Sequence, residues 1–425
     1  MSLRRSLLIG LLIYGFLLSG LGTLSGSFLA VAVPLALYLA AVLVYRPYDV
    51  RLRIYRRLSH DHVRPATKIT VDLVITNDGE DLEELLIEDE VPAGLTSDGD
   101  TSLLLSLPSG ASHTLTYHVE GARGSYRFEQ TQVTVSERFG LFRRQRPYPV
   151  HSRLSVLPAS PSLRSLKIRP ARTRGFAGPI PSRQGGSGTD FYGVRSYEPG
   201  DPPQWINWRL SARHPREIYT NQFEQERIAD VGLILDARER TNVSTRDSSL
   251  FEHSVEVTAA LADSFLHDGN RVGLLVYGRG LERTFPGYGK LQRQRILYAL
   301  AMAQVGDSLV FDSLDYLPTR FFAAKSQLVL VSPLCDDDPP VLTRLRARGY
   351  QILVISPDPV DFERRGQAPS RTLDMAIRIA QAERQLRIRQ LERVGVVVIN
   401  WQVGQALDAT VQAGLKRYLP QALRG

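Results

Sequence analysis

The sequence predicts an N-terminal two-helix transmembrane hairpin, an all-β immunoglobulin-like sandwich and a C-terminal doubly wound α/β domain. Three observations support this prediction: an almost uncharged stretch over residues 6–45, short alternating apolar segments over residues 61–158, and alternating strand-like and helix-like segments over residues 230–425. Hydrophobic residues make up 43% of the 425-residue chain, which is enough for packed cores. We therefore expect a folded rather than an intrinsically disordered chain.

The N-terminal stretch is apolar in two blocks, SLLIGLLIYGFLLSG and FLAVAVPLALYLAAVLVY, joined by LGTLSGS. Each block is near the length of about 18–20 residues that a bilayer core requires. A cleaved signal peptide is the alternative, with Leu21 to Ser27 as its cleavage region. We favour two membrane spans joined by a tight turn, because the apolar sequence resumes at once after that region.

Basic residues flank the predicted hairpin on both sides, whereas its turn carries none. By the positive-inside rule both ends face the cytoplasm, which predicts a multi-pass inner (plasma) membrane protein with cytoplasmic soluble domains. Residues 1–60 then form the hairpin and a basic juxtamembrane segment that binds anionic lipid headgroups. This segment accounts for much of the net charge of +8 without any nucleic acid. Its arginines are Arg46, Arg51, Arg53, Arg56 and Arg57.

A single cysteine, Cys335, agrees with this location, since it excludes an intrachain disulfide and favours a reducing compartment. Residues 61–158 then alternate apolar and polar side chains, as over 69–75, and the turn Asn77-Asp78-Gly79 follows. The same pattern recurs near 103–107 and 115–119. Short strands at this spacing predict an antiparallel sandwich without catalytic residues.

Residues 159–229 are expected to form a linker rich in Pro, Gly, Ser and Arg. Its segment Gly185-Gly186-Ser187-Gly188 suggests a phosphate-binding loop, but the spacing of the known phosphate loops is absent. A flexible or closely packed loop is the favoured interpretation.

Residues 230–425 contain five short apolar runs that read as buried strands, and helical spacing separates several of them. Helices are expected near 251–265, 291–304, 339–348, 370–393 and 405–422. Ligands of doubly wound folds bind beyond the carboxyl ends of the strands, and Asp236 stands at such an end. The expected strands are VGLILDA, RVGLLVYG, SQLVLVSP, QILVISP and VGVVVINW.

Several motifs along the chain resemble the family called domain of unknown function 58. This resemblance implies a von Willebrand factor A-like α/β domain and a frequent genomic association with MoxR-type AAA ATPases and transglutaminase-like proteins. It does not establish a biochemical activity. Pro202 and Asn207 depart from the residues common in the family. The motifs are Gly186-x-Gly188-x-Asp190-Phe191, Arg195-x-Tyr197-x-Pro199-Gly200-Asp201, Ile206-x-Trp208-x-x-Ser211-Ala212-Arg213, Glu224-x-Glu226, the Asp236 strand, Phe139-Gly140-Leu141-Phe142 and Glu252.

The resemblance also implies a test for a metal site. Von Willebrand-type domains often hold a divalent cation through Asp-x-Ser-x-Ser, helped by a threonine and a later aspartate. Here the segment is Asp236-Ala237-Arg238-Glu239-Arg240, so two arginines without lone pairs replace the hydroxyls. The aspartates Asp336 to Asp338 arrive several residues after the strand ending in Ser332. We therefore expect no metal and no cofactor.

Two interpretations remain open for the strand end. In one, Asp236 accepts hydrogen bonds from loop amides or pairs with a nearby arginine, while Arg238 and Arg240 are solvated. In the other, the two arginines bind a partner's carboxylate directly through charge-assisted contacts.

The motif segment around Pro199-Gly200-Asp201 has two interpretations as well. The indoles of Trp205 and Trp208 could clamp the segment to the domain, while arginines such as Arg195 and Arg213 pair with Glu224 or Glu226. Alternatively this Trp- and Arg-rich surface, with Asp201, is a hot spot for a protein partner. Nucleotide stacking on these aromatics is disfavoured because the chain carries no nucleic-acid motif.

Three classes of function follow. The favoured one is a membrane-tethered adaptor that presents a degenerate metal site to cytoplasmic partners, with a MoxR-type AAA ATPase as the expected partner. A hydrolase using Asp236 or Asp201 is the alternative, although no nucleophile–base pair has diagnostic spacing. A purely structural membrane protein comes third.

Overall fold

The structure is a computed structural model. It describes residues 2–418 except 25, 46–49, 137–142, 167–172, 175–179, 215, 246–247, 307, 309, 366 and 369. The chain divides into two compact units, Met1–Leu157 and Pro158–Gly425. Arg46 and the Phe139-Gly140-Leu141-Phe142 segment lie outside the described residues.

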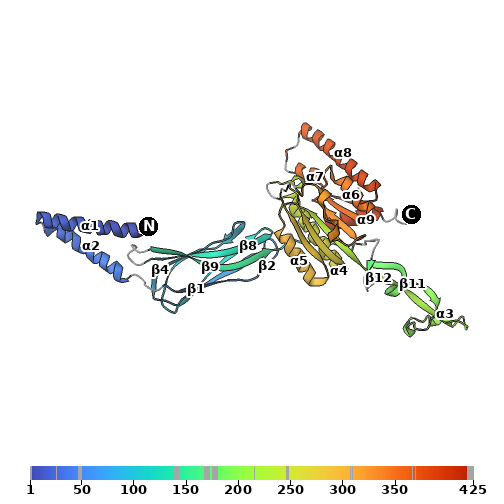
Figure 1. Ribbon diagram of the computed structural model, residues 1–425, viewed down its shortest axis with the longest axis horizontal. Helices are drawn as coiled ribbons and strands as arrows, with labels where there is room; N and C mark the ends of the chain where they lie inside the picture. The colour runs from blue at the N-terminus through green and yellow to red at the C-terminus, as the bar shows by residue number, and fades with distance from the viewer. Residues whose placement is uncertain are drawn as a thin grey trace. The chain divides into compact units, whose positions relative to one another are not determined.

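Two helices, α1 (Ser2–Thr23) and α2 (Gly26–Tyr45), begin the first unit and lie side by side (Figure 1). The rings of Phe16 and Phe28 stack between them with centroids 6.4 Å apart. Many large apolar side chains of both helices are exposed, among them Leu11 and Leu21. Within the part of the chain that the structure describes, no helix is both long enough and apolar enough to cross a membrane.

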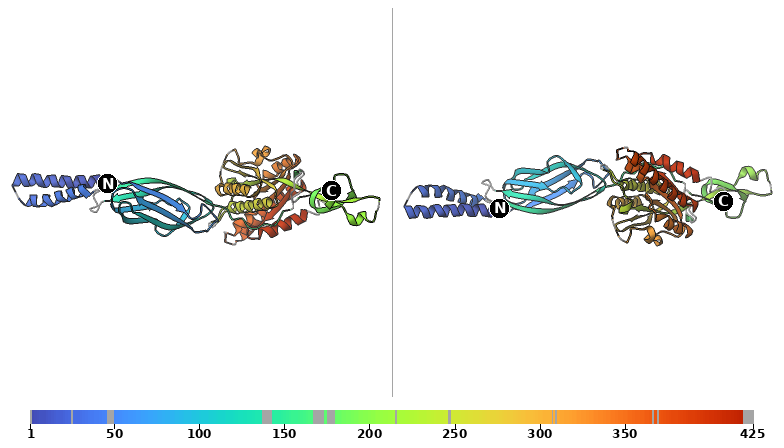
Figure 2. Two further views of the ribbon diagram at one scale, coloured as in Figure 1. Left: turned by 90° about the horizontal axis from the view of Figure 1, so that it is seen from below. Right: turned by 90° about the horizontal axis from the view of Figure 1, so that it is seen from above.

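A sandwich of two sheets forms the rest of the first unit (Figure 2). Alternation of buried and half-buried residues along β3 gives the sheet one inward face, where Val71, Leu73 and Ile75 are fully buried. One sheet has the order β1 (Leu52–Leu58), β3 (Ile69–Asn77), β7 (Ser112–Gly121) and β5 (Leu95–Asp98). The other has the order β2 (His62–Val63), β9 (Arg143–Val156), β8 (Gly124–Ser136), β4 (Leu82–Asp89) and β6 (Ser102–Leu107).

Part of the segment expected to lie beside the membrane is strand β1 of the sandwich, so the expectation is wrong for this part. The period of two along β1 turns Arg56 inward, where its Nε donates to Asp89 Oδ2 at 3.0 Å and its Nη1 to Val150 O at 2.6 Å. Its guanidinium also lies 4.6 Å from the centre of the Phe128 ring. Arg56 is therefore a core residue and does not reach lipid headgroups, whereas the exposed Arg53 pairs with Asp78.

The second unit is built on a sheet with the order β14-β13-β12-β15-β16-β17. All neighbours in this order are parallel except the edge strand β14. Helices cover both faces (Figures 1 and 2). The strands are β12 (Tyr219–Asp236), β13 (Arg271–Tyr277), β14 (Leu281–Gly287), β15 (Gln327–Val331), β16 (Gln351–Pro357) and β17 (Val397–Trp401), and the helices are α4 (Leu250–His267), α5 (Gly289–Met302), α6 (Asp338–Ala347), α7 (Pro359–Arg364), α8 (Arg371–Arg393) and α9 (Leu407–Tyr418).

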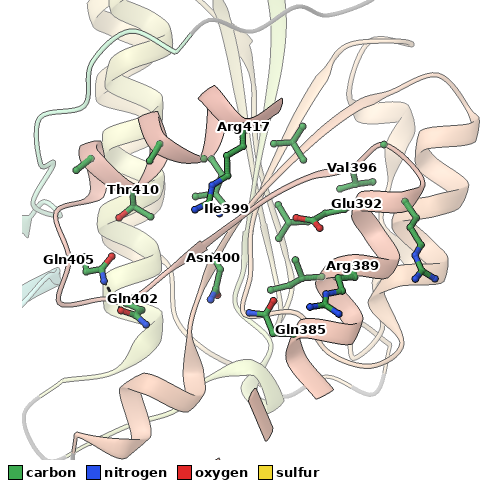
Figure 3. A pocket seen from close by; sticks show the side chains of 18 of the residues that line it. Gln385, Arg389, Glu392, Val396, Ile399, Asn400, Gln402, Gln405, Thr410 and Arg417 are labelled. Atoms are coloured by element: carbon green, nitrogen blue, oxygen red, sulfur yellow. Dashed lines mark hydrogen bonds between the residues drawn. The ribbon is translucent and has the colours of Figure 1, made fainter. Parts of the chain in front are cut away.

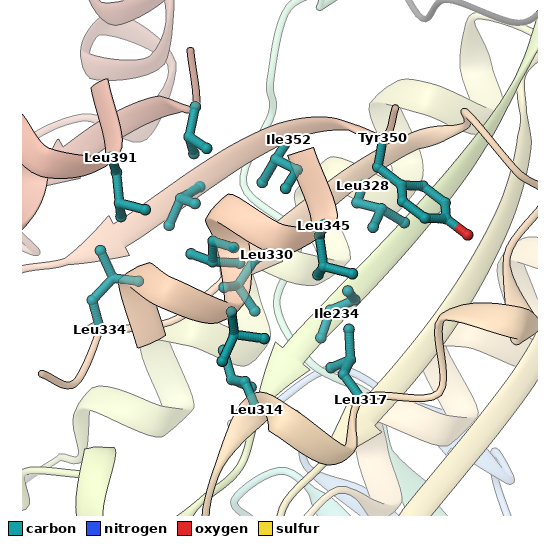
Figure 4. Packing of buried hydrophobic residues seen from close by; sticks show 14 of the residues in the cluster. Ile234, Leu314, Leu317, Leu328, Leu330, Leu334, Leu345, Tyr350, Ile352 and Leu391 are labelled. Atoms are coloured by element: carbon teal, nitrogen blue, oxygen red, sulfur yellow. The ribbon is translucent and has the colours of Figure 1, made fainter. Parts of the chain in front are cut away.

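Covering both faces of the sheet explains why its strands are continuously apolar. All five residues of β15 are buried, and Leu328, Leu330 and Ile352 pack against Leu345 of α6 on one face (Figure 4). Strand order reverses between β12 and β15, the two central strands. Their carboxyl ends are where a doubly wound fold usually binds its ligand.

The expected linker contains two long strand segments. β11 (Ile180–Ser196) pairs antiparallel with β12, and β12 runs without a break through the expected boundary at residue 230. A short 3₁₀ helix (Pro203–Trp205) and α3 (Trp208–Ser211) lie between the two strands. Residues 185–188, considered as a phosphate loop, are part of β11.

Candidate functional site

The candidate site lies where β12 ends at Asp236 and β15 ends at Val331. The Asp236 carboxylate accepts hydrogen bonds from the Ser332 hydroxyl at 2.6 Å and from the Arg238 backbone N–H at 3.1 Å. Asp236 and Ser332 follow adjacent parallel strands, so the fold itself brings them together. Both residues are buried.

The guanidinium of Arg238 uses all five of its N–H donors in this site. Nε and Nη2 donate to the two oxygens of Asp236 at 2.9 and 2.7 Å. Nη1 and Nη2 donate to the two oxygens of Asp338 at 3.0 and 2.9 Å, and Nη1 also donates to Asp312 O at 3.1 Å. Arg238 is only 1% exposed, which corrects the expectation of a solvated side chain. The two carboxylates hold the pKa of Arg238 above its usual value despite burial.

Asp338 reaches the site because the chain turns back after β15. Leu334 has a left-handed φ of 69°, and its N–H donates to the Ser332 hydroxyl at 3.1 Å. The Cys335 N–H then donates to Asp338 Oδ2 at 2.7 Å. The expectation that the aspartates arrive too late for the site is therefore wrong for Asp338. Burial raises the pKa of this carboxyl, and Arg238 opposes that rise.

Arg240 lies at the surface of the same cluster with 33% of its side chain exposed. Its guanidinium contacts Asp337 at 2.7 Å and Asp312 at 3.1 Å. The hydrogen bond to Asp337 raises the pKa of Arg240 against the effect of burial. Of the two arginines in the degenerate motif, only Arg240 is accessible to another molecule.

These contacts show that the strand-end site contains its own cation. A guanidinium lies between Asp236 and Asp338, the two carboxylates that could otherwise bind a divalent ion. Its bidentate geometry with each carboxylate satisfies the buried charges. Among the described residues, no group of three or more His, Cys, Asp or Glu side chains is placed to hold a metal ion.

A second buried arginine, Arg384 of α8, lies at the carboxyl ends of β15, β16 and β17. It donates to Pro333 O at 2.6 Å, to Ser356 Oγ at 2.8 Å and to Asn400 Oδ1 at 2.7 Å. Burial lowers the pKa of Arg384 to about 10. Sequence reasoning missed this residue, although an arginine within the helical apolar pattern of Ile388 and Leu391 was a signal for it.

A surface pocket of about 560 Å³ lies over the Arg238 cluster. Its lining includes Arg240, Asp337, Cys335 and Arg387. Burial raises the pKa of the Cys335 thiol to about 12, so this thiol is protonated at neutral pH. The pocket thus offers charged groups for binding and no activated nucleophile.

A larger open groove of about 1320 Å³ runs between α8, β17 and α9 (Figure 3). Gln385, Arg389 and Glu392 line it from α8, while Thr410 and Arg417 line it from α9. Four arginines, five side-chain amides and one hydroxyl contribute to this lining with a single glutamate, and the remaining lining residues are apolar or glycine. The groove is therefore basic and of mixed polarity, without a nucleophile–base pair among its lining residues.

The motif segment forms a second polar cluster. Asp201 accepts from Arg195 Nη2 at 2.6 Å and from the Glu198 backbone N–H at 3.0 Å, and these bonds lower the pKa of Asp201. Trp208 is 67% exposed, so it does not clamp the segment to the domain. Arg213 is exposed too. The side chains of Glu224 and Glu226, the expected partners of these arginines, lie outside what the structure describes.

The two groups of predicted site residues do not form one site. Thr220 and Asp236 lie near opposite ends of β12, which corresponds to roughly 50 Å along a strand at about 3.3 Å per residue. Trp205, Trp208 and Arg213 precede the first end, whereas Arg238 and Arg240 follow the second.

Comparison with known proteins supports a DUF58 family protein. Residues 193–365 match the family described as protein of unknown function DUF58. The Bacillus subtilis (strain 168) protein YeaD, described as uncharacterized, is 28% identical over 200 residues, which cover 46% of this chain and 48% of YeaD. The match thus spans about half the length of that relative.

Solved structures give weaker similarities. Proximal thread matrix protein 1 from the mussel byssus is 12% identical with a TM-score of 0.28, over 44% of this chain and 46% of its own. A FixG-related protein from Vibrio parahaemolyticus is 11% identical with a TM-score of 0.18, over 25% of this chain and 95% of its own. TM-scores this low do not show a shared fold or a shared function.

Proposed function

We propose that this protein is an adaptor whose α/β unit, of von Willebrand A-like type, binds protein partners at its strand-end surface without a coordinated ion. One observation carries the proposal: the Arg238 guanidinium lies between Asp236 and Asp338, so the chain itself supplies the positive charge of this site. A site closed in this way leaves its rim, rather than its interior, for recognition.

The rim above Arg238 has the properties of a polar protein contact. Arg240 and Arg387 provide partly exposed guanidinium groups and Asp336 and Asp337 exposed carboxylates around the same pocket, and Asp312 pairs with Arg240 beside it. Mixed charges in fixed positions favour specificity and association rate for a partner with the complementary pattern. In this proposal Arg240 contacts a partner carboxylate, whereas Asp236 and Arg238 maintain the surface from below.

The DUF58 resemblance, which the family match over residues 193–365 supports, is the basis for the proposed partner, and the apolar N-terminal stretch with its basic flanks is the basis for the proposed location. We propose a MoxR-type AAA ATPase as the partner. We further propose that the α1–α2 hairpin inserts in the inner (plasma) membrane and leaves the two soluble regions in the cytoplasm. The exposed apolar side chains along both helices, such as Leu7 and Leu11, support an apolar environment for this hairpin.

The hydrolase alternative gains little from the two carboxylates assigned to it. Both oxygens of Asp236 accept hydrogen bonds from Arg238 in a buried cluster. Asp201 is held by Arg195 and a backbone amide, and its pKa is lowered, which makes it a weak general base.

Co-purification of the full chain with the MoxR-type ATPase from the same cell tests the proposal. We expect recovery of the ATPase that depends on ATP and is lost in Arg240→Glu. Arg293→Glu is the matched control, because Arg293 is also a partly exposed arginine in an ion pair, here with Asp263. Undiminished recovery with Arg240→Glu would overturn the proposed surface, and substrate turnover that requires Asp236 would favour the hydrolase.

A further inference from the structure

Helix α8 (Arg371–Arg393) is far less buried than the other long helix of the unit, α4. Its buried residues are Arg384, Ile388 and Leu391, all in its C-terminal half. No side chain between residues 371 and 383 is buried. Helices in proteins gain most of their stability from packing of an apolar face. The unburied N-terminal half of α8 is therefore a candidate surface for binding another molecule.

Two stripes of side chains run along α8 on opposite faces, one half-buried to buried stripe that includes Arg384 and one exposed apolar stripe. The first contains Ile377, Arg384 and Leu391, spaced by seven, and it packs on the domain. The second contains Met375, Ile379, Ala382 and Leu386, and its three large side chains are 70%, 61% and 65% exposed. The described residues include no group that covers this second stripe.

The spacing of the exposed stripe is that of a coiled-coil seam. Steps of four, three and four separate its members, which places Ile379 and Leu386 at heptad position a and Met375 and Ala382 at position d. Of the two residues at position a only Ile379 is β-branched, and neither d position holds leucine, so the charges beside the stripe rather than its core residues decide the orientation of a helix pair. The stripe therefore has the geometry to bind another helix along its length.

The charges beside the stripe identify that helix. Arg378 occupies position g and Glu383 occupies position e of the next heptad, five residues later. In a parallel pair, position g of one helix faces position e of the next heptad on the other, so Arg378 would meet Glu383 of a second copy, and the reverse pair would form at the same time. The surface is thus complementary to itself, as a two-fold interface requires.

We propose that α8 is a self-association surface, where two copies of this chain pair in parallel along Met375, Ile379, Ala382 and Leu386. The seam is about three turns long and meets Arg389 at the next d position, where two like charges would face each other. The buried area is therefore small, and the dimer is weak or transient rather than obligate. This inference does not depend on the proposed partner.

Disulfide cross-linking of the full chain tests the proposal. In a parallel pair position d faces its own counterpart, so Ala382→Cys in a Cys335→Ser background forms a dimer on oxidation. The control Gln381→Cys is an equally accessible cysteine one position away from the seam, and we expect at least fivefold less dimer from it. We expect the same dimer from Ala382→Cys in a chain that keeps Cys335. This result would exclude an effect of the Cys335→Ser substitution.

Charge reversal gives the second test. Arg378→Glu in the Ala382→Cys chain should reduce the dimer at least fivefold, and adding Glu383→Arg should restore it. Leu386→Asp should also abolish the dimer, whereas Leu291→Asp, at a similarly exposed leucine of α5, should not. No dimer from Ala382→Cys, no rescue by the double reversal, or capture of a different protein by the new cysteine would overturn the proposal.

Discussion

The guanidinium of Arg238 and the carboxylate of Asp338 meet edge to edge, with Nη1–Oδ1 and Nη2–Oδ2 distances of 3.0 and 2.9 Å, although the two residues are 100 positions apart. The contact ties the loop after β12 to the start of α6. A single buried cation thereby links the two central strand ends.

Removing this cation is expected to destabilise the α/β unit. Arg238→Met leaves two buried carboxylates without their partner, at a cost of about 3–5 kcal/mol. Urea unfolding followed by tryptophan fluorescence measures the loss, because all three tryptophans lie in this unit and Trp401 is buried. Arg240→Met, at a partly exposed pair, should change the free energy by less than about 1 kcal/mol. Equal stabilities of the two variants would contradict the role given to Arg238.

Replacing both arginines by serine should create a metal site. Arg238→Ser with Arg240→Ser restores the Asp-x-Ser-x-Ser pattern beside Asp338 and the Ser332 hydroxyl, and such oxygen ligands suit Mg²⁺. We expect the natural chain to show no tight Mg²⁺ binding in calorimetry, and the double variant to bind Mg²⁺ and melt at a higher temperature in its presence. Asp236→Asn in the double variant should remove both effects. Tight binding by the natural chain that disappears in Asp236→Ala would contradict the prediction.

The sequence predicted the core strands of the α/β unit well because their burial is continuous. RVGLLVYG and QILVISP coincide with the parallel strands β13 and β16, whereas VGLILDA is only the C-terminal part of β12, which begins at Tyr219. It did not predict where the Asp336–Asp338 loop would go, since the left-handed turn is made by Leu334 rather than by glycine or asparagine. The pairing of Arg238 with Asp338 depends on that turn.

The sequence did not reveal that two arginines, Arg56 and Arg384, are buried. Arg56 was counted with the basic flank of the hairpin, yet the strand period places it inside the sandwich. Arg384 lay within an apolar helical pattern and received no role. In both cases the acceptors that satisfy the charge come from distant segments, which local sequence does not reveal.

The thiol of Cys335 is expected to react slowly in the folded chain. Burial raises its pKa to about 12, so the reactive thiolate is scarce at pH 8 and becomes more abundant as the pH rises. We expect labelling by iodoacetamide at pH 8 to be at least tenfold slower than in the urea-unfolded chain, and to accelerate between pH 8 and 10. Equal labelling rates of the folded and unfolded chains would contradict the burial of the Cys335 thiol.

The sandwich should depend on its own buried pair. Asp89 accepts from Arg56, from the Tyr117 hydroxyl at 2.6 Å and from the Thr131 hydroxyl at 2.8 Å, which joins the two sheets. Asp89→Ala leaves the Arg56 cation unpaired and should cost about 3–5 kcal/mol. Hydrogen exchange of peptides from residues 52–136 measures the change without a tryptophan in this unit. The exposed pair offers the control: Asp78→Ala should leave the exchange of the core strands unchanged.

Trp208 separates the two interpretations of the motif segment. An indole that clamps the segment would be buried, and its loss would reduce stability, whereas this indole is 67% exposed. Trp208→Ala should therefore change the free energy of unfolding by less than about 0.5 kcal/mol, as surface substitutions usually do. It should nevertheless reduce recovery of a protein partner, because exposed tryptophans are frequent hot spots. Arg209→Ala, one position along the same short helix, serves as the comparison for exposure. A large loss of stability in Trp208→Ala, followed by fluorescence of Trp401, would restore the clamping role and remove the segment as a partner surface.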